Sequence, residues 1–208
     1  MPANSQYRPT LAKLSEKPEI QIDPKTGALT SYIYEGQEYL ASPVRLSLYR
    51  PATDNDNREK KGGAKVWRKL GLNHLVQRVL SVKTSGHTTY SEVELLNDKN
   101  ETIGSATFEY TIRKDGILSV QTRFVPDTTF VGSLARVGLV FEMPHSFNRV
   151  TYLGRGEHET YADRKLSGRI GIYHTDAERM FHYYVRPQAT GNRTDVRWMQ
   201  VSDDLGKG

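Results

Sequence analysis

A period-two alternation of apolar and polar residues in 102–113 is the feature that most constrains what this chain can fold into. Within it, polar residues separate Ala106, Phe108, Tyr110 and Ile112. Successive side chains of a strand point to opposite faces, so the pattern is typical of a strand with one buried face. A Lys-Asp-Gly turn at 114–116 follows, and apolar residues alternate again in 118–124. The sequence therefore predicts a β-hairpin.

The same alternation recurs on both sides of this hairpin. We expect further strands at 20–22, 29–34, 39–40, 44–49, 137–141 and 193–201. The stretch 137–141 has the thinnest polar face, so we expect it to lie more centrally. Only 64–70 indicates a helix, and Gly71 would end it. Many short strands with almost no helix favour an all-β antiparallel sandwich over a parallel α/β sheet.

Length and composition exclude several classes of protein. The 208 residues are too few for a complete (β/α)₈ barrel of about 250 residues. The chain has no cysteine, which excludes disulfides, thiolate metal sites and a thiol nucleophile but leaves both cytoplasm and periplasm open. No apolar run reaches the roughly 20 residues that span a bilayer, and 1–15 lacks the apolar core of a signal peptide. We expect no membrane partner and no signal peptide.

The charge of the chain is mildly basic, with 29 Lys and Arg against 24 Asp and Glu. The densest basic stretch, 58–69, is flanked by Asp54 and Asp56 and contains Glu59. A nucleic-acid interface needs a basic stripe on one face. The mixed signs instead favour a solvated surface and no nucleic-acid partner.

The last residues, 202–208, have the composition of a turn that leads into another strand. We therefore expect the natural domain to continue past Gly208, although a polar tail has the same composition. A truncated sheet would expose an edge and apolar surface, which favours self-association.

No cofactor motif is present: the chain lacks a phosphate-binding glycine loop, a zinc HExxH motif, a GxSxG elbow and a complete calcium loop. The absence of these motifs argues against a cofactor or a metal site in this chain.

Three polar segments remain as candidates. In the first, 50–57, a guanidinium, carboxylates and amides follow an apolar strand. Such groups can bind the adjacent hydroxyls of a sugar. They are equally typical of an Asx-rich loop that binds its own backbone.

The second segment, 153–165, places His158, Glu159, Asp163 and Arg164 after two glycines. A histidine beside carboxylates can be a general acid or base or a metal ligand, or the segment can be an Arg–carboxylate brace between strands. The third segment, 184–198, ends at Trp198, which could stack on a sugar or lie in the core. The candidate carbohydrate-binding residues are Arg50, Asp54, Asn55, Asp56, His158, Glu159, Arg164 and Trp198.

In order and spacing, the three segments resemble the RAPxDND, LGxGPHENYPDRK and YxRPQENGNRTDVRW motifs of one family. It is the C-terminal (small-chain, domain 5 type) domain of glycoside hydrolase family 2 β-galactosidases, and the resemblance runs from about Ile20 to Gly208. Glu157, Thr160 and Ala162 replace the usual Pro, Asn and Pro of the second motif. Ala189-Thr190 replaces Glu-Asn in the third, and Thr53 replaces a commoner apolar residue in the first. Losing two prolines relaxes the φ angles of that loop.

The resemblance implies a galactose-mutarotase-like antiparallel β-supersandwich, truncated at its C-terminus. It also implies a division into a linker or tail at 1–18 and a partial small-chain domain at 19–208. The parent enzyme would hydrolyse terminal β-D-galactosides with retention, using two glutamates of a separate barrel, with Mg²⁺ and Na⁺ bound in other domains. Its remaining domains would be the partners of this chain, and a galactoside would bind at most weakly.

Glu157 and Glu159 match no catalytic position of the family, and the aromatic residue that the family domain lends to the galactoside site would lie beyond Gly208. A retaining mechanism needs two carboxyl groups about 5–5.5 Å apart.

Three hypotheses follow. The chain is a non-catalytic scaffold domain of a β-galactosidase. Alternatively, it is a free-standing carbohydrate-binding module using Arg50, Asp54, Asn55, His158, Glu159 and Trp198. The third alternative is a mutarotase-like epimerase with His158 and Glu159 as acid and base.

Overall fold

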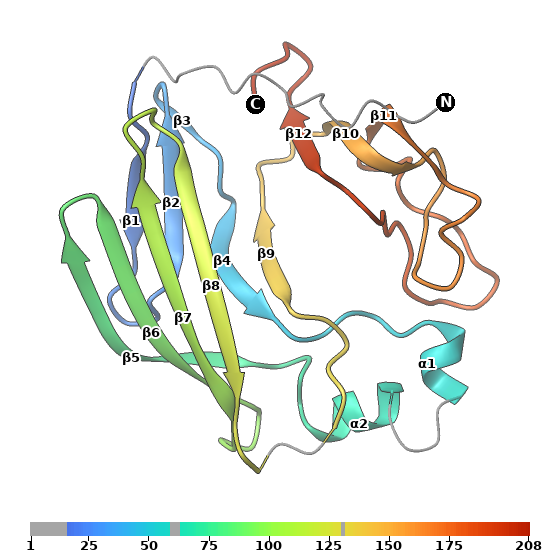
Figure 1. The fold of residues 1–208 in the computed structure, drawn as a ribbon, viewed down its shortest axis with the longest axis horizontal. Coiled ribbons are helices and arrows are strands. Elements are labelled where there is room, and N and C mark those ends of the chain that lie inside the picture. Colours follow the sequence, from blue (N-terminus) through green and yellow to red (C-terminus); the bar gives the residue numbers. More distant parts are fainter. Residues whose placement is uncertain (1–15, 59–62, 130–131) are drawn as a thin grey trace. The chain divides into compact units, whose positions relative to one another are not determined.

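The structure, a computed structural model, describes residues 16–58, 63–129 and 132–208 (Figure 1). In these ranges the chain forms twelve β-strands and two short helices. The described residues fall into two compact units, an N-terminal unit that ends at Met143 and a C-terminal unit of 144–208. All strand pairs are antiparallel, which confirms the predicted all-β class.

The N-terminal unit contains three sheets. The first has the order β1 (Glu19–Ile22), β2 (Leu29–Tyr34), β3 (Gln37–Glu38). The second pairs β4 (Ser42–Ser47) with β9 (Gly138–Glu142). The third has the order β5 (Val76–Ser85), β6 (Thr88–Leu96), β7 (Thr102–Ile112), β8 (Leu118–Pro126). The predicted hairpin is β7–β8, and its turn has Gly116 at φ 85°.

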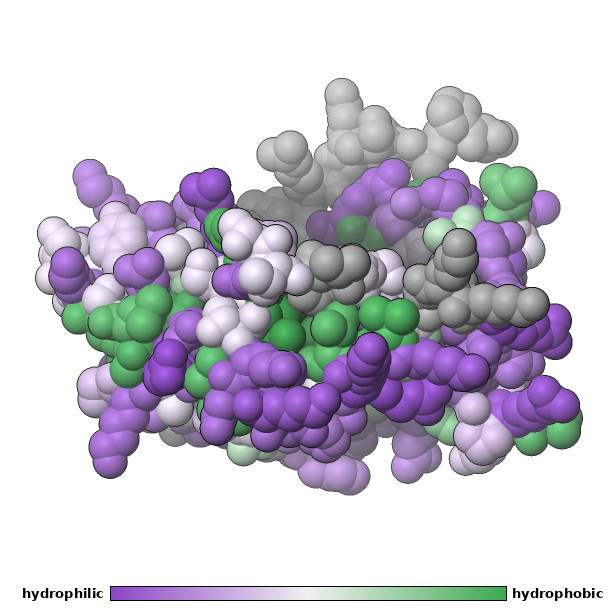
Figure 2. All heavy atoms as spheres, turned by 90° about the horizontal axis from the view of Figure 1, so that it is seen from below, coloured by the Kyte–Doolittle hydropathy of each residue, from purple (hydrophilic) through white to green (hydrophobic). Residues whose placement is uncertain are grey.

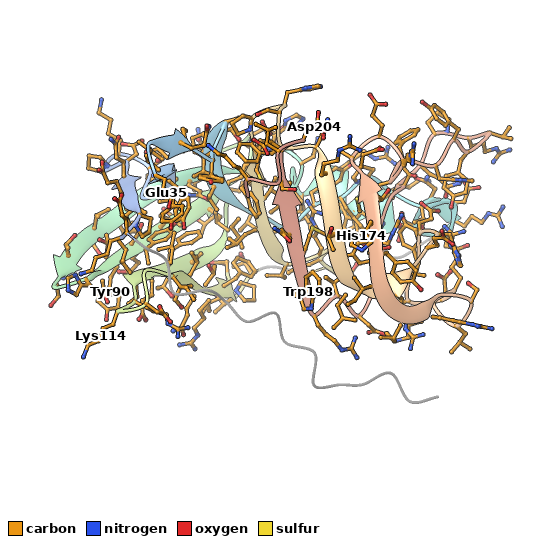
Figure 3. The ribbon with its side chains drawn as sticks, turned by 90° about the horizontal axis from the view of Figure 1, so that it is seen from above. Glu35, Tyr90, Lys114, His174, Trp198 and Asp204 are labelled. Carbon is orange, nitrogen blue, oxygen red and sulfur yellow. The ribbon has the colours of Figure 1, made fainter. Side chains whose placement is uncertain are left out.

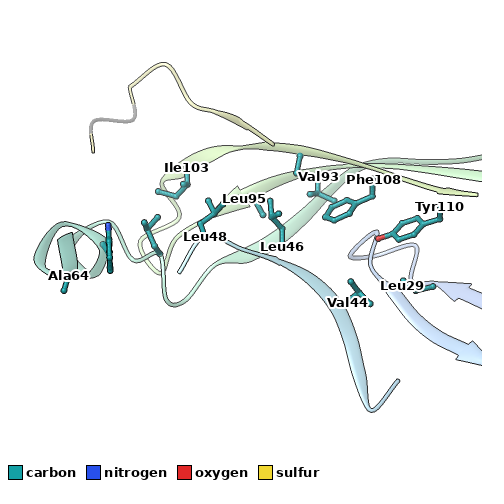
Figure 4. Close-up of a cluster of buried hydrophobic side chains, with 13 residues drawn as sticks. Leu29, Val44, Leu46, Leu48, Ala64, Val93, Leu95, Ile103, Phe108 and Tyr110 are labelled. Carbon is teal, nitrogen blue, oxygen red and sulfur yellow. The ribbon is translucent and has the colours of Figure 1, made fainter. Parts of the chain in front are cut away.

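The core of the N-terminal unit lies between the β5–β8 sheet and strands β2 and β4 (Figure 4). On β7, Ala106, Phe108 and Tyr110 are almost fully buried, as the alternation predicts. Burial raises the pKa of Tyr110 to about 12, so this phenol stays neutral. The buried cluster comprises Leu29, Val44, Leu46, Leu48, Ala64, Trp67, Leu72, Val93, Leu95, Ile103, Ala106, Phe108 and Tyr110.

Helix α2 (Gly63–Lys69) confirms the predicted helix and buries Ala64 and Trp67. Gly71, at φ 67°, lies just past its end, and the Gly71 N–H donates to the carbonyl of Arg68. Glycine adopts this left-handed conformation without steric cost, so the helix ends here.

Helix α1 (Asp54–Arg58) differs from the Asx-rich loop that the composition of 50–57 indicates. Its Ncap is Thr53: the Asp56 N–H donates to Thr53 Oγ1 at 3.4 Å, and the Thr53 N–H donates to the Asp56 carboxylate at 2.7 Å. This reciprocal pair is a capping box with aspartate in place of glutamate. Thr-x-x-Asp was therefore the sequence signal for α1.

The central placement of 137–141 is wrong, although the strand itself exists as β9. Among the described strands β9 pairs only with β4, and the side chains of Val137 and Phe141 are 58% and 56% exposed. The small number of polar residues in 137–141 therefore reflects apolar side chains that are exposed, and not a strand that is buried on both faces.

Two other strands are shorter than predicted. Strand β3 ends at Glu38 and does not extend over 39–40: the Glu38 carboxylate accepts the N–H groups of Tyr32 and Leu40, both at 2.9 Å, and only the Tyr39 N–H donates to β2, to the Tyr32 carbonyl at 3.0 Å. The strand expected at 193–201 begins only at Trp198, although the Arg197 N–H still donates to the Leu153 carbonyl at 2.8 Å and the Arg155 N–H donates to the Thr194 carbonyl at 3.0 Å.

The C-terminal unit is built on one sheet of order β11 (Arg169–Asp176), β10 (Arg149–Gly156), β12 (Trp198–Ser202). Figure 3 shows these three strands side by side, with His174 on β11 and Trp198 on β12. The buried residues around the central strand are Phe147, Val150, Tyr152, Leu153 and Ala189. The predicted turn after β12 is present at 203–206.

The surface shown in Figure 2 is mostly hydrophilic, with patches of hydrophobic residues among the charged side chains. Neither helix of the described ranges is long and apolar enough to cross a membrane.

Candidate functional site

The first polar segment is organised around the carboxylate of Asp56. The Arg50 guanidinium donates to both of its oxygens, at 2.6 and 3.2 Å, and the hydroxyl of Thr53 donates at 2.8 Å. The Arg50 guanidinium also lies 5.2 Å from the centroid of the Trp67 ring, a cation–π distance. Arg50 therefore joins α1 to the core residue of α2.

The charge of Asp56 is stabilised by these donors. Burial by itself raises the pKa of Asp56, but the hydrogen bonds from Arg50 and Thr53 outweigh burial and hold the pKa below its ordinary value. The carboxylate therefore stays ionised as part of a bidentate ion pair. Asp54 and Asn55, the other two candidates of this segment, lie on α1 and have interactions of their own within the chain.

The second and third segments meet at Glu159, whose side chain is only 7% exposed. One carboxylate oxygen accepts hydrogen bonds from the guanidinium of Arg164 and the hydroxyl of Tyr184. The other accepts from the Thr190 hydroxyl at 3.1 Å and the Gly191 N–H at 2.7 Å. A buried carboxylate needs such compensation, and here four donors from three stretches of chain supply it.

Thr160, the neighbour of Glu159, is fully buried and makes a second connection between the two segments. Its hydroxyl lies 2.9 Å from that of Thr194 and accepts the Thr194 N–H, also at 2.9 Å. The Asn192 side chain donates to the Thr160 carbonyl at 2.7 Å, and the Thr160 N–H donates back to the Asn192 carbonyl at 2.8 Å.

Two arginines fix the same loops through backbone carbonyls. Arg155 donates to Asp195 at 2.5 Å and to the carbonyl of Gly168 at 2.8 Å. Arg193 donates to the Tyr152 hydroxyl at 2.9 Å and to the carbonyl of Glu157 at 3.3 Å. Each arginine therefore holds at least one main-chain carbonyl and one side chain in place.

The contacts of His158 and Trp198 described here are with residues other than Glu159. His158 is exposed, and its Nε2 lies 2.9 Å from the Ser167 hydroxyl. Trp198 is partly buried and pairs with Leu153 across the β10–β12 ladder. No hydrogen bond among the described residues joins the side chains of His158 and Glu159, and their role as acid and base stays a prediction.

The sequence candidates therefore divide by unit. Arg50, Asp54, Asn55 and Asp56 belong to the N-terminal unit, and His158, Glu159, Arg164 and Trp198 belong to the C-terminal unit. Two pairs come together, Arg50 with Asp56 and Arg164 with Glu159. The Arg164–Glu159 pair is the Arg–carboxylate brace raised as the structural alternative for the second segment, and the Arg50–Asp56 pair braces the first segment in a similar way. A role of the eight candidate residues in sugar binding stays a prediction.

The residues that reasoning from sequence missed are those that complete the Glu159 cluster: Tyr184, Thr190, Gly191, Thr160 and Thr194. Thr160 and Thr190 stand where the family motifs have other residues. These two differences from the motifs were the signal in the sequence that could have drawn attention to both positions. Within the three described ranges, no group of three His, Asp or Glu side chains could hold a metal ion.

The fold and the site define the class of protein. It is an all-β antiparallel sandwich in which the polar motifs form hydrogen bonds with loops of the same chain. A model of the beta galactosidase small chain family matches residues 15–206, and the chain belongs to that family.

The chain is also similar to several curated beta-galactosidases. It is 33% identical over 188 residues to the enzyme of Priestia megaterium, covering 90% of this chain and 18% of the relative. It is 30% identical over 178 residues to that of Lactobacillus delbrueckii subsp. bulgaricus, with coverages of 83% and 17%. Beta-galactosidase BgaC of Bifidobacterium adolescentis is 26% identical over 197 residues, with coverages of 88% and 17%. The chain thus spans less than a fifth of the length of each of these relatives.

Proposed function

We propose that this chain is a non-catalytic domain of a β-galactosidase that hydrolyses terminal β-D-galactosides with retention. In this role the domain supports the remaining domains of the enzyme, which are its partners, and covers one side of their active site. The catalytic carboxylates, with any Mg²⁺ and Na⁺ ions, lie in those domains.

The observation that carries this proposal is the bonding of Glu159. A catalytic carboxylate must be able to reach substrate, whereas this one is buried and accepts four hydrogen bonds from protein groups. Glu157, two residues earlier, is exposed. A retaining glycosidase needs two carboxyl groups about 5–5.5 Å apart across the scissile bond, and a carboxylate committed to a brace cannot act as one of them. The family membership and the coverage of less than a fifth of each relative agree with a supporting role.

Hydrolysis of p-nitrophenyl β-D-galactoside by the purified 208-residue chain tests the proposal. We expect a rate equal to that of a mock purification from cells with an empty vector. The beta-galactosidase of Priestia megaterium, assayed in parallel, checks that the substrate and buffer support turnover. A rate above the mock purification that disappears in Glu159→Gln would contradict the proposal.

A further inference from the structure

The outer face of the β5–β8 sheet carries an ordered set of polar side chains that the proposed function leaves unused. The ladder registers place Lys83, Tyr90, Glu109 and Gln121 opposite one another in a row across the four strands. The adjacent row is Ser81, Glu92, Thr107 and Arg123. The intervening residues of β6 and β7, such as Val93 and Phe108, face the core.

These two rows surround a hollow of about 530 Å³ in the surface of the sheet. Small-molecule sites have volumes of roughly 300–1,000 Å³, so the hollow is large enough for a ligand of that class. Tyr90, labelled in Figure 3, is 49% exposed although it lies on a central strand. Its ring is the aromatic surface of the hollow.

Most polar side chains of the hollow have no hydrogen-bond or ion-pair partner among the residues that the structure describes. Neighbouring side chains on the same sheet are paired, as Arg78 with Glu94 and Thr88 with Thr111. In contrast, no hydrogen bond or ion pair within the described residues engages the side chains of Lys83, Glu92, Gln121 or Arg123. Glu109 accepts only a long bond of 3.4 Å from the Thr111 hydroxyl.

The composition of the hollow selects one class of ligand. Two carboxylates and two cations give it no net charge, so it favours neither a polyanion such as a nucleic acid nor a charged peptide. Closely spaced acceptors, donors and an amide match the alternating donor and acceptor roles of neighbouring hydroxyl groups. The exposed ring supplies an apolar face for the C–H surface of a sugar.

We propose that the outer face of the β5–β8 sheet is a saccharide-binding site. A neutral oligosaccharide lies across the strands with one sugar ring on Tyr90. Glu109 and Gln121 on one row, and Glu92 and Arg123 on the other, bind its hydroxyl groups.

Saturation-transfer difference NMR on the 208-residue chain tests this site, with lactose, cellobiose and maltotriose as probes. We expect saturation transfer to at least one probe, with a Kd of about 1 mM, the weak affinity of an open hollow. Tyr90→Ala should weaken that binding about ten-fold, because the ring is lost. Tyr90→Phe keeps the ring and should weaken it less than about three-fold. Tyr183→Ala removes an exposed tyrosine of the other unit, 88% accessible, and should change nothing.

A second variant keeps the test decisive if Tyr90→Ala fails to fold, which circular dichroism would detect. Gln121→Ala changes an exposed side chain of the hollow and should weaken binding at least three-fold. The proposal is overturned if no probe receives saturation at about 20 mM, or if Tyr90→Ala and Gln121→Ala bind as tightly as the unchanged chain. Binding that is lost in Tyr183→Ala would overturn it as well.

Discussion

Glu159 shows how a single residue can look catalytic in the sequence and be structural in the fold. It stands beside a histidine and near Asp163 and Arg164, the composition of an acid–base site. The structure instead surrounds it with donors on both oxygens. A buried carboxylate without those donors would be strongly destabilising, so the donors and the burial belong together.

Replacing Glu159 by alanine should lower the free energy of unfolding of the C-terminal unit by about 1–3 kcal/mol, because Tyr184 and Gly191 lose this acceptor. The Thr190 hydroxyl keeps the His182 carbonyl as an acceptor. The ion pair itself adds little to this figure, since the Arg164 side chain is 48% exposed and solvated. Urea denaturation followed by the NMR signals of the Tyr152 and Leu153 amides, which belong to the C-terminal unit, measures the effect.

Glu157→Gln is the matched control for that variant. Glu157 is exposed, and its backbone carbonyl, rather than its side chain, accepts the bond from Arg193. Its substitution should shift the free energy of unfolding by no more than about 0.5 kcal/mol. Equal losses in the two variants would show that the buried donors contribute nothing specific.

Asp56 makes the stability of the N-terminal unit depend on pH. Because its folded pKa is depressed, the stabilisation is fully present above its unfolded pKa of about 4 and is lost as pH falls through the folded value. Between pH 7 and about pH 3, the unchanged chain should lose more stability than Asp56→Asn. Urea denaturation at several pH values, followed by Trp67 fluorescence, compares the two. Parallel pH profiles for the two proteins would refute the linkage.

At the scale of elements, the hairpins were predictable and the loops were not. Strands β7 and β8 follow from a two-residue period, because the apolar face of β7 is buried over many residues and that of β8 is partly buried. Helix α1 has no buried residue, so no apolar period marks it and only the Thr53–Asp56 box does. The Glu159 cluster joins residues up to 34 positions apart, and no local pattern encodes such contacts.

Gly104, on β7, tests the packing of the β7–β8 hairpin. A Cβ at this position would meet the carbonyl oxygen of Val125 and would lie 2.7 Å from the Phe124 ring. Gly104→Ala should therefore cost about 1–3 kcal/mol of stability through overpacking. Thermal unfolding measured by circular dichroism detects such a loss as a lower Tm.

Gly138→Ala provides the comparison, since Gly138 also lies in a strand, β9, but nothing lies within 4 Å of a Cβ built there. We expect a change of about 0.5 kcal/mol or less. If Gly138→Ala is as damaging as Gly104→Ala, the loss reflects glycine itself and not the close approach to β8.

At the scale of the whole molecule, apolar burial is unevenly divided. The 13-residue cluster of buried residues belongs entirely to the N-terminal unit, whereas the C-terminal unit has few buried apolar residues and many side-chain hydrogen bonds. Hydrophobic burial is the dominant favourable contribution to folding, so the two units should differ in local stability.

Native-state hydrogen exchange should therefore show its strongest protection in β6 and β7, with lower protection throughout 144–208. The amides of Val93 and Phe108 are suitable reporters for the first group, and those of Tyr152 and Leu153 for the second. Exchange of all four at one common rate would mean that the two units unfold together.

The hydroxyls of Thr160 and Thr190 have a consequence for the exchange of segments between relatives. Thr160 meets Thr194, and Thr190 meets Glu159, so each motif completes the bonding of the other. Because these bonds join the two loops, chimeras that move 157–162 and 189–194 together should fold where single-loop chimeras fail.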